Sequence, residues 1–212
     1  PRVRQLLGAV EIHFELDSTN RYLREGADRF APGHVCLAER QTAGRGRRGR
    51  EWVSPFGANL YLSILWHFDK GAAQLSGLSL ALGVAVVQAL DSVGARGAQL
   101  KWPNDILWEG RKLAGILVEL AGETEGPCRV VLGVGVNVGM PEDARNAIGQ
   151  PWADLVEMAP AVGRSRLAGT LIDALVNALE LFDSGGLEAF VESWRERDAH
   201  VDTEVSLHLP NR

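Results

Sequence analysis

The chain has 212 residues, of which 46% are hydrophobic and 23% charged, a composition typical of a globular protein with one large domain or two small ones. Its formal net charge of -5 and isoelectric point near 5.6 argue against a protein that coats nucleic acid, because such proteins usually carry a basic domain. Cys36 and Cys128 stand far apart, with no CxxC pair and no His or Cys at metal-ligand spacing. The sequence therefore predicts neither a disulfide framework nor a protein-bound metal, and it fits a reducing cytoplasm.

The first predicted elements are short. Residues 1–7 lack the apolar core of a signal peptide, so no secretion signal is expected. Residues 11–14 are predicted as a strand, and residues 17–20, Asp-Ser-Thr-Asn, then supply a side-chain cap for a helix that runs to about residue 24. A second strand over residues 35–39 leads into a loop rich in glycine and arginine.

The middle of the chain alternates between strands and one helix. Residues 59–68 are predicted as a central strand, because bulky and β-branched side chains occupy both of its faces. The most apolar run, 78–90, lies in a helix predicted over residues 73–92. That run is too short to cross a bilayer, so we expect a buried helix and no membrane partner. Further strands with short connections predict a mostly antiparallel sheet; they cover residues 98–102, 106–108, 112–120 and 129–138.

The last part of the chain combines a loop with two helices. Residues 139–150 have weak apolar periodicity and are predicted as a long loop, of the kind that often forms a functional lid. Helices are predicted over residues 165–183 and 187–197, with a Gly-Gly pair between them. Over residues 205–209 the pattern again indicates a strand.

The strongest local signal is the loop 44–50, whose seven residues include four arginines and three glycines. In a chain of net negative charge, this loop concentrates positive charge at one place. Glycine lets the backbone approach a ligand closely and arginine offers forked donors, so the pattern predicts a site for a phosphate or a carboxylate. Taken alone, the loop could also be a solvated basic turn or a nucleic-acid patch. A Walker loop is excluded, because no Gly-Lys-Ser/Thr follows.

Longer blocks of sequence accompany this loop. Residues 41–43, Gln-Thr-Ala, precede it, and residues 52–60, Trp-Val-Ser-Pro-Phe-Gly-Ala-Asn-Leu, follow it. Residues 101–105 are Lys-Trp-Pro-Asn-Asp, and residues 111–119 are Arg-Lys-Leu-Ala-Gly-Ile-Leu-Val-Glu. Together with the Asp-Ser-Thr-Asn turn, these blocks resemble the biotin protein ligase family, and the resemblance extends over about residues 12–200.

The resemblance implies an α+β fold in which helices flank a mostly antiparallel mixed sheet, the class II synthetase-like catalytic domain of biotin ligases. It also implies a two-step reaction. Biotin and ATP, with Mg²⁺, form biotinyl-adenylate and pyrophosphate, and the adenylate then transfers biotin to a lysine of the biotin carboxyl carrier domain of acetyl-CoA carboxylase. Residues 1–200 would be this catalytic domain and residues 201–212 the start of a small C-terminal β-barrel. The resemblance allows a homodimer; because the chain begins almost at the catalytic domain, we expect no DNA binding.

The resemblance also implies roles for individual residues. Lys112 and Arg47 are expected to be catalytic, and Asp105 to assist the acceptor lysine or a metal. The residues expected to bind biotin are Ser18, Thr19, Asn20, Gln41, Gly44, Arg45, Arg47, Lys112, Gly115, Gly133 and Gly135. Those expected to bind the nucleotide are Arg47, Arg48, Arg50, Trp52, Asn104, Lys112, Asn137 and Trp152.

Several of these residues also have an ordinary structural interpretation. Gly133 and Gly135 are expected to let a flat ligand lie against the backbone, and the apolar Trp52 and Trp152, placed in polar loops, to gain packing only around a ligand. The structural alternatives are a helix cap for Ser18 and Thr19, a surface ion pair for Lys101 and Asp105, core packing for Trp102 and Trp108, and an aggregation-limiting edge lysine for Lys112.

Two other functions share some of these features. A lipoate ligase has the same fold class and adenylate chemistry, but its Arg-Arg-x-Ser-Gly-Gly-Gly type of segment is absent from the sequence. A non-catalytic biotin sensor would not need the basic loop together with Lys112, so their presence argues against it.

Overall fold

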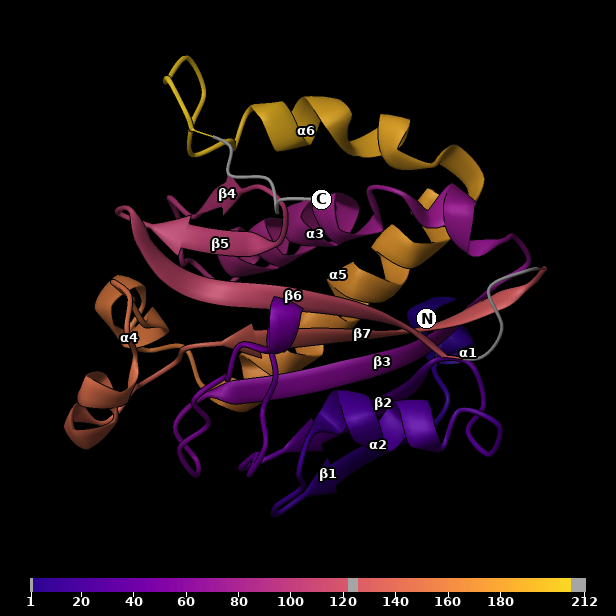
Figure 1. Cartoon of the computed structure of the whole chain (residues 1–212), viewed down its shortest axis with the longest axis horizontal. Helices are drawn as coiled ribbons and strands as arrows, with labels where there is room; N and C mark the ends of the chain where they lie inside the picture. The colour runs from indigo at the N-terminus through magenta and orange to yellow at the C-terminus, as the bar shows by residue number, and fades with distance from the viewer. Residues whose placement is uncertain (1, 122–125, 207–212) are drawn as a thin grey trace.

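A mixed sheet of seven strands forms the centre of the protein in the computed structural model, which describes residues 2–121 and 126–206 (Figure 1). The strand order is β1-β2-β3-β7-β6-β5-β4; β1 and β2 are parallel, and the other neighbours are antiparallel. The predicted α+β fold with a mostly antiparallel mixed sheet is therefore confirmed. The strands are β1 (Val10–His13), β2 (His34–Ala38), β3 (Leu60–Phe68), β4 (Gln99–Lys101), β5 (Asp105–Trp108), β6 (Arg111–Ala121) and β7 (Cys128–Val136).

Helices cover both faces of this sheet (Figure 1). α2 lies over β2, β3 and β7 on one face, whereas α3 and α5 pack together against the other face. α1 contacts α5, and α6 contacts α3. The helices are α1 (Arg2–Leu6), which the sequence did not predict, α2 (Thr19–Glu25), α3 (Leu78–Ser92), α4 (Leu155–Met158), α5 (Arg164–Gly185) and α6 (Val191–Arg195).

The central strands β3 and β7 are apolar on both faces because both faces are covered. Leu62 and Ile64 belong to the large hydrophobic cluster that α3 and α5 share with the sheet. Leu65 and its neighbour Val131 on β7 belong to a smaller cluster beneath α2, together with Leu23. All five side chains are buried, as the pattern of residues 59–68 predicts for a central strand.

The turn that starts α2 combines two tasks. Ser18 is the N-cap of the helix, and its side-chain oxygen accepts a hydrogen bond from the backbone N–H of Arg21 at 3.4 Å. Thr19 and Asn20 follow in the first helical turn and are both buried at 4% exposure. The cap thus holds two polar side chains against the sheet.

The apolar run of α3 is confirmed as a buried helix. By length and composition alone the 21 residues Ala72–Ser92 could cross a membrane, since 18 of them in succession have a mean hydropathy of 1.6, although the run 78–90 by itself is as short as expected. However, 61% of these 18 residues are buried inside the protein, as in a core helix. Leu82, Val86 and Leu90 are each fully buried against the sheet and α5.

Local backbone geometry shortens two predicted helices. Gly77 has φ 84°, a left-handed conformation that suits glycine, and it separates a 3₁₀ turn (Ala72–Leu75) from α3. The helix predicted over residues 73–92 is thus interrupted. The helix predicted over residues 187–197 is likewise divided into a 3₁₀ turn (Leu187–Phe190) and the short α6.

Two predictions concern the loop segments. The loop predicted over residues 139–150 contains a 3₁₀ helix, Glu142–Ala147, so it is more regular than expected. The strand expected over residues 205–209 is not formed at Val205 and Ser206, and its other three residues lie outside the described residues. The domain boundary near residue 200 remains a prediction.

Candidate active site

Two adjoining cavities, of about 440 and about 410 Å³, lie where the first turn of α2, the basic loop and strands β3, β5, β6 and β7 meet. They share the side chains of Arg50, Glu51, Trp52, Lys112 and Gln150. The larger cavity brings together these predicted residues: Ser18, Thr19, Asn20, Gln41, Arg45, Arg47, Arg48, Arg50, Trp52, Asn104, Asp105, Lys112, Gly115, Gly133 and Gly135. The smaller cavity brings together Arg50, Trp52, Lys112, Asn137 and Trp152.

Gly44 is a predicted biotin residue that lines neither cavity. A Cβ atom at this position would lie 2.5 Å from the backbone oxygen of Trp52 and 2.8 Å from the hydroxyl of Ser54. Its lack of a side chain therefore lets the loop fold closely against Trp52 and Ser54, and the contact of Gly44 with biotin stays a prediction.

The polar end of the larger cavity is built by the α2 turn and Gln41. The backbone N–H of Thr19 donates to Gln41 Oε1 at 2.9 Å, and Thr19 Oγ1 lies 3.1 Å from the same oxygen. Ser18 is 2% exposed and lines the cavity while capping α2. The helix-cap interpretation and the predicted ligand-facing position therefore hold together for this turn.

The basic loop is held by its own backbone and by contacts with β6 and the residues before β5. Gly46 N–H donates to the carbonyl of Arg50 at 2.7 Å, and Arg48 takes a positive φ of 57° at the turn between them. Arg47 donates to Asn104 Oδ1 at 3.3 Å, and Arg45 Nη2 lies 3.5 Å from Glu119 Oε1. The guanidinium groups of this loop thus lie around one cavity.

Glycines on β6 and β7 make room for protein side chains. A Cβ atom on Gly135 would lie 2.6 Å from the indole of Trp52, and one on Gly115 would lie 3.1 Å from the same ring. A Cβ atom on Gly133 would lie 2.2 Å from Asn20 Oδ1. These contacts correct the expectation that Trp52 packs only around a ligand, because its ring already lies against the two strands.

Lys112 lies at the junction of the two cavities. Its Nζ is 2.7 Å from Asp105 Oδ1, and it lies 5.4 Å from the centre of the Trp52 ring. Both charged side chains are largely shielded, with 16% and 22% exposure. The edge-lysine alternative is wrong, because the backbone of Lys112 is paired on both sides, with Leu107 of β5 and with Trp152.

Two further structural alternatives are also overturned. Asp105 pairs with Lys112, so the surface ion pair with Lys101 is not formed in the described structure. Trp102 is 57% exposed at the rim of the larger cavity and is not a core residue. Trp108, in contrast, packs against the hydrophobic core, and Arg111 lies over its ring.

Asn137 supports the wall of the smaller cavity. Its side-chain amide donates to the carbonyls of Lys112 and Ala153, at 3.2 and 3.1 Å. The backbone of Trp152 pairs with that of Lys112, which holds this part of the chain beside the sheet, and the packing of its side chain around a ligand stays a prediction. Asp154, next along the chain, caps α4 and accepts from the backbone N–H of Met140 at 3.1 Å.

Apolar side chains of the strands complete the larger cavity, and the sequence analysis did not assign them to it. Tyr61 and Leu62 come from β3, and Ile116, Leu117 and Val134 come from β6 and β7. The Tyr61 hydroxyl donates to the carbonyl of Pro55 at 3.0 Å, and burial raises the pKa of this phenol well above its ordinary value. A sheet register would have been needed to find these residues, since each looks like ordinary strand core.

Few side chains that could bind a metal ion lie around the cavities. Within residues 2–121 and 126–206, no group of three His, Cys, Asp or Glu side chains could hold one. The carboxylates that line the larger cavity are Glu51 and Asp105, and Asp105 is already paired with Lys112. Because Mg²⁺ takes six oxygen ligands, these two side chains alone do not complete its coordination.

Comparisons with known proteins agree with this geometry. Residues 13–137 match the model of the Biotin/lipoate A/B protein ligase family. The chain is 43% identical to the "Bifunctional ligase/repressor BirA" of Salmonella typhimurium, in an alignment that covers 100% of this chain and 70% of that protein. It is 35% identical to the "Biotin--[acetyl-CoA-carboxylase] ligase" of Mycobacterium tuberculosis, covering 97% of this chain and 79% of the relative.

A solved structure gives the same result. The biotin protein ligase from Aquifex aeolicus in complex with biotin and ATP superposes with a TM-score of 0.76 at 27% identity, covering 90% of this chain and 78% of that chain. The family match, the two relatives and the shared fold lead to one conclusion: the chain belongs to the Biotin/lipoate A/B protein ligase family.

Proposed function

We propose that this protein is an ATP-dependent biotin protein ligase. The observation that carries the proposal is that polar side chains, Ser18, Thr19 and Gln41, and a set of cationic side chains line the same adjoining cavities. Biotin has an apolar bicycle with one polar urea edge and, at its other end, a carboxylate. A site that pairs both ends and buries the middle suits such a molecule.

In the first step, a biotin carboxylate oxygen attacks the α-phosphorus of ATP and forms the acyl–phosphate bond. The bond from the α-phosphorus to the bridging oxygen breaks, and pyrophosphate leaves. Lys112 and Arg47 stabilise the negative charge that gathers on the phosphoryl and leaving oxygens. No protein nucleophile is needed, because the reacting groups only have to be held together and neutralised.

In the second step, the amine of an acceptor lysine attacks the acyl carbon of biotinyl-adenylate, and AMP leaves. The attacking amine must lose a proton, and Asp105 is our candidate to assist it, because its carboxylate lines the same cavity. The proposed acceptor is a biotin carboxyl carrier domain of acetyl-CoA carboxylase, and the proposed location is the cytoplasm. We propose the ligase reaction alone for this chain; the repressor activity is named for the Salmonella relative.

The site roles follow the cavities. We propose that the α2 turn, Gln41 and the basic loop hold biotin, and that Arg48, Arg50, Trp52, Asn137 and Trp152 surround the nucleotide. Mg²⁺ is proposed only as the ion that accompanies the phosphates of ATP. It supplies charge neutralisation when bound.

Two assays test this proposal. With biotin and Mg-ATP, the protein should release pyrophosphate, and with a carrier domain added it should transfer labelled biotin only when ATP is present. Lipoate should be a far poorer substrate; activation of lipoate as fast as biotin would move the assignment to a lipoate ligase. Tight biotin binding without pyrophosphate release would instead identify a biotin sensor.

A further inference from the structure

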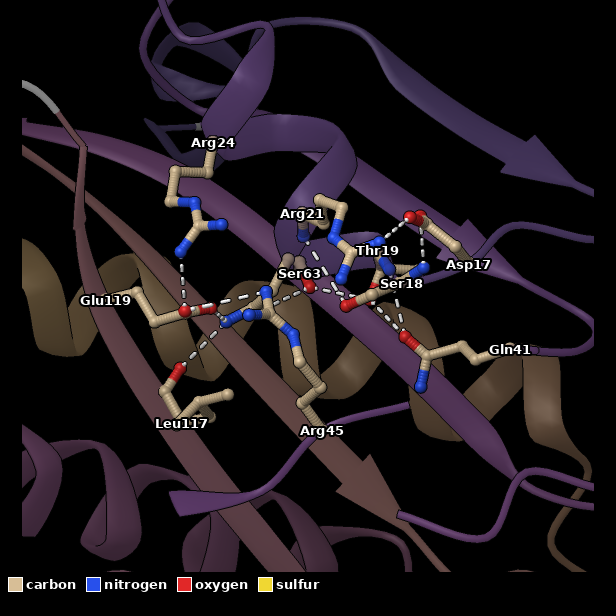
Figure 2. Close-up of polar contacts among 11 residues, drawn as sticks. Asp17, Ser18, Thr19, Arg21, Arg24, Gln41, Arg45, Ser63, Leu117 and Glu119 are labelled. Atoms are coloured by element: carbon tan, nitrogen blue, oxygen red, sulfur yellow. Dashed lines mark hydrogen bonds and ion pairs between the residues drawn. The ribbon is translucent and has the colours of Figure 1, made fainter. Parts of the chain in front are cut away.

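A line of buried and half-buried polar side chains connects Glu119 with Gln41 (Figure 2), and Asn20, Thr19 and Gln41 in this line also belong to the wall of the larger cavity. Asn20 Nδ2 donates to Glu119 Oε2 at 2.9 Å, and Asn20 Oδ1 lies 2.6 Å from the hydroxyl oxygen of Ser63. That oxygen lies 2.7 Å from Thr19 Oγ1, which lies 3.1 Å from Gln41 Oε1. Ser63 is fully buried on β3, and neither it nor Glu119 lines the cavity. We call these five side chains the relay.

The Glu119 end fixes the orientation of the Asn20 amide. Arg24 donates to Glu119 Oε1 at 3.0 Å, and Arg45 approaches the same oxygen at 3.5 Å (Figure 2). A carboxylate between two guanidinium groups accepts hydrogen bonds and has none to donate. The NH₂ group of Asn20 therefore points to Glu119 and to the Leu117 carbonyl, 3.3 Å away. The reversed amide would set its oxygen against two acceptors.

With the amide fixed, Asn20 Oδ1 is an acceptor, so the Ser63 hydroxyl donates to it. The Ser63 oxygen must then accept from Thr19, because two oxygens 2.7 Å apart repel each other unless a hydrogen lies between them. Thr19 has one hydroxyl hydrogen, and the relay uses it on Ser63. The relay has three oxygen–oxygen contacts but only two hydroxyl hydrogens, those of Ser63 and Thr19. The longest contact, between Thr19 and Gln41, therefore has no hydrogen between its two oxygens.

The Gln41 amide cannot reverse this assignment. Its oxygen accepts from the backbone N–H of Thr19 at 2.9 Å, and its NH₂ group lies 3.4 Å from Ser54 Oγ. Gln41 Oε1 and Thr19 Oγ1 consequently stand side by side as acceptors at the polar end of the cavity.

We propose that Glu119, Asn20 and Ser63 are positioning residues that set the hydrogen-bond polarity of this end of the cavity, so that it requires a ligand carrying N–H donors. The inference rests on the proposed function, since the N–H groups of the biotin urea would supply those donors. An N–H group placed between the two acceptors removes the unfavourable contact that the relay leaves in the protein. An ether or carbonate oxygen at the same place would add a third acceptor.

The test compares two ligands in direct binding measurements by calorimetry. One is biotin, and the other is an analogue in which ring oxygens replace both urea N–H groups. The parent protein should prefer biotin strongly. In Ser63→Ala the Thr19 hydroxyl is free to turn to Gln41, so biotin affinity should fall about tenfold, the equivalent of one lost hydrogen bond. The analogue should lose little affinity, and the preference should shrink.

Two further variants distinguish a change in hydrogen-bond polarity from a general disturbance of the cavity. Ser54→Ala also removes a hydroxyl next to Gln41 but lies outside the relay, so the preference should stay as in the parent. Glu119→Gln should turn its amide oxygen to Arg24 and its NH₂ group to Asn20, so the Asn20 amide should reverse and the preference should shrink as in Ser63→Ala. Adenylate formation by Ser63→Ala at saturating biotin should match the parent rate, because Ser63 does not reach the reacting atoms.

The outcomes are distinguishable. A parent protein that binds no biotin contradicts the proposed function itself. A parent that binds biotin, beside a folded Ser63→Ala with an unchanged preference, overturns the relay alone. The same holds if Ser54→Ala lowers the preference as much as Ser63→Ala does.

Discussion

At the scale of single residues, Lys112 is the side chain on which the proposed chemistry depends most, because it reaches both cavities. Lys112→Ala should lower the rate of adenylate formation on the order of a hundredfold, since one charged group facing a developing anion is worth about 3 kcal/mol. Lys70→Ala is the matched control, because Lys70 binds Asp183 far along the chain and lines neither cavity. Pyrophosphate release measures both rates; equal rates for parent and Lys112→Ala would leave the lysine without a catalytic role.

Gly135 allows a test of the indole contact. In Gly135→Ala the new methyl group would lie 2.6 Å from Trp52, so the ring must move and the shared wall of the cavities with it. We expect weaker binding of both biotin and ATP. Gly169→Ala is the control: nothing lies within 4 Å of its added methyl group in α5, so binding should be unchanged and the free energy of unfolding should rise by up to about 1 kcal/mol. If Gly135→Ala bound biotin and ATP as tightly as Gly169→Ala does, the close contact between Gly135 and the Trp52 ring would be contradicted.

The buried thiol of Cys36 gives a prediction about reactivity. Burial raises its pKa to about 12, so at neutral pH almost no thiolate is present. The folded protein should therefore react slowly with Ellman's reagent at pH 8, and rapidly once urea unfolds it. Burial also raises the pKa of Cys128, so fast labelling of this second thiol should not hide the slow reaction of Cys36. Fast labelling of the native protein at both positions would show that these side chains are reachable.

Sequence motifs located most of the residues around the cavities, because each block contributes several neighbours in the chain. Ser63 and Glu119 were not found. Ser63 is one small polar residue in an apolar strand, and its partner Asn20 is 43 positions away. Glu119 lies 99 positions from Asn20, and their contact exists only because α2 lies across β3, β7 and β6. Such contacts depend on sheet register and helix placement, which a local pattern does not encode.

At the scale of secondary-structure elements, the basic loop joins the two cavities, and we expect biotin to order its tip. The backbone N–H groups of Gly46 and Trp52 already donate within the loop, at 2.7 and 3.0 Å. Hydrogen exchange should therefore show these two amides protected without ligand, and biotin alone should protect the residues between them. ATP affinity should rise with biotin bound, by a coupling of about 1 to 3 kcal/mol. Residues of β7 serve as the unchanged reference; identical exchange across the loop with and without biotin would refute the coupling.

The elements themselves were predicted well where burial on one or two faces is continuous, as in β3 and α5. Boundaries were missed where a single backbone angle decides them. Gly77 divides the predicted helix because of its positive φ, and the sequence there shows only a glycine beside apolar residues. α1 was missed because five residues carry too little periodicity to predict a helix.

At the scale of the whole molecule, the charge around the larger cavity is opposite in sign to the net charge of the chain. The chain has a formal charge of -5, yet six basic and two acidic side chains line the larger cavity. We expect ATP affinity to fall several-fold when sodium chloride rises from about 50 to about 300 mM, because salt screens the attraction between separated charges. Biotin, with a single carboxylate, should be affected less. Calorimetric titration of each ligand at both salt concentrations measures this; equal losses would mean that the local positive field does not select the nucleotide.

The burial of α3 has a consequence for synthesis on the ribosome. α3 is covered by α5, and α5 ends about 90 residues after α3 does. At about 5 to 20 residues added per second, a ribosome needs roughly 5 to 19 s to produce the covering helix. During that interval the nascent chain carries an apolar segment long enough to be mistaken for a membrane span. We therefore expect slower translation to prolong the exposure of this segment, and chaperones that hold apolar nascent segments to shield it during that time.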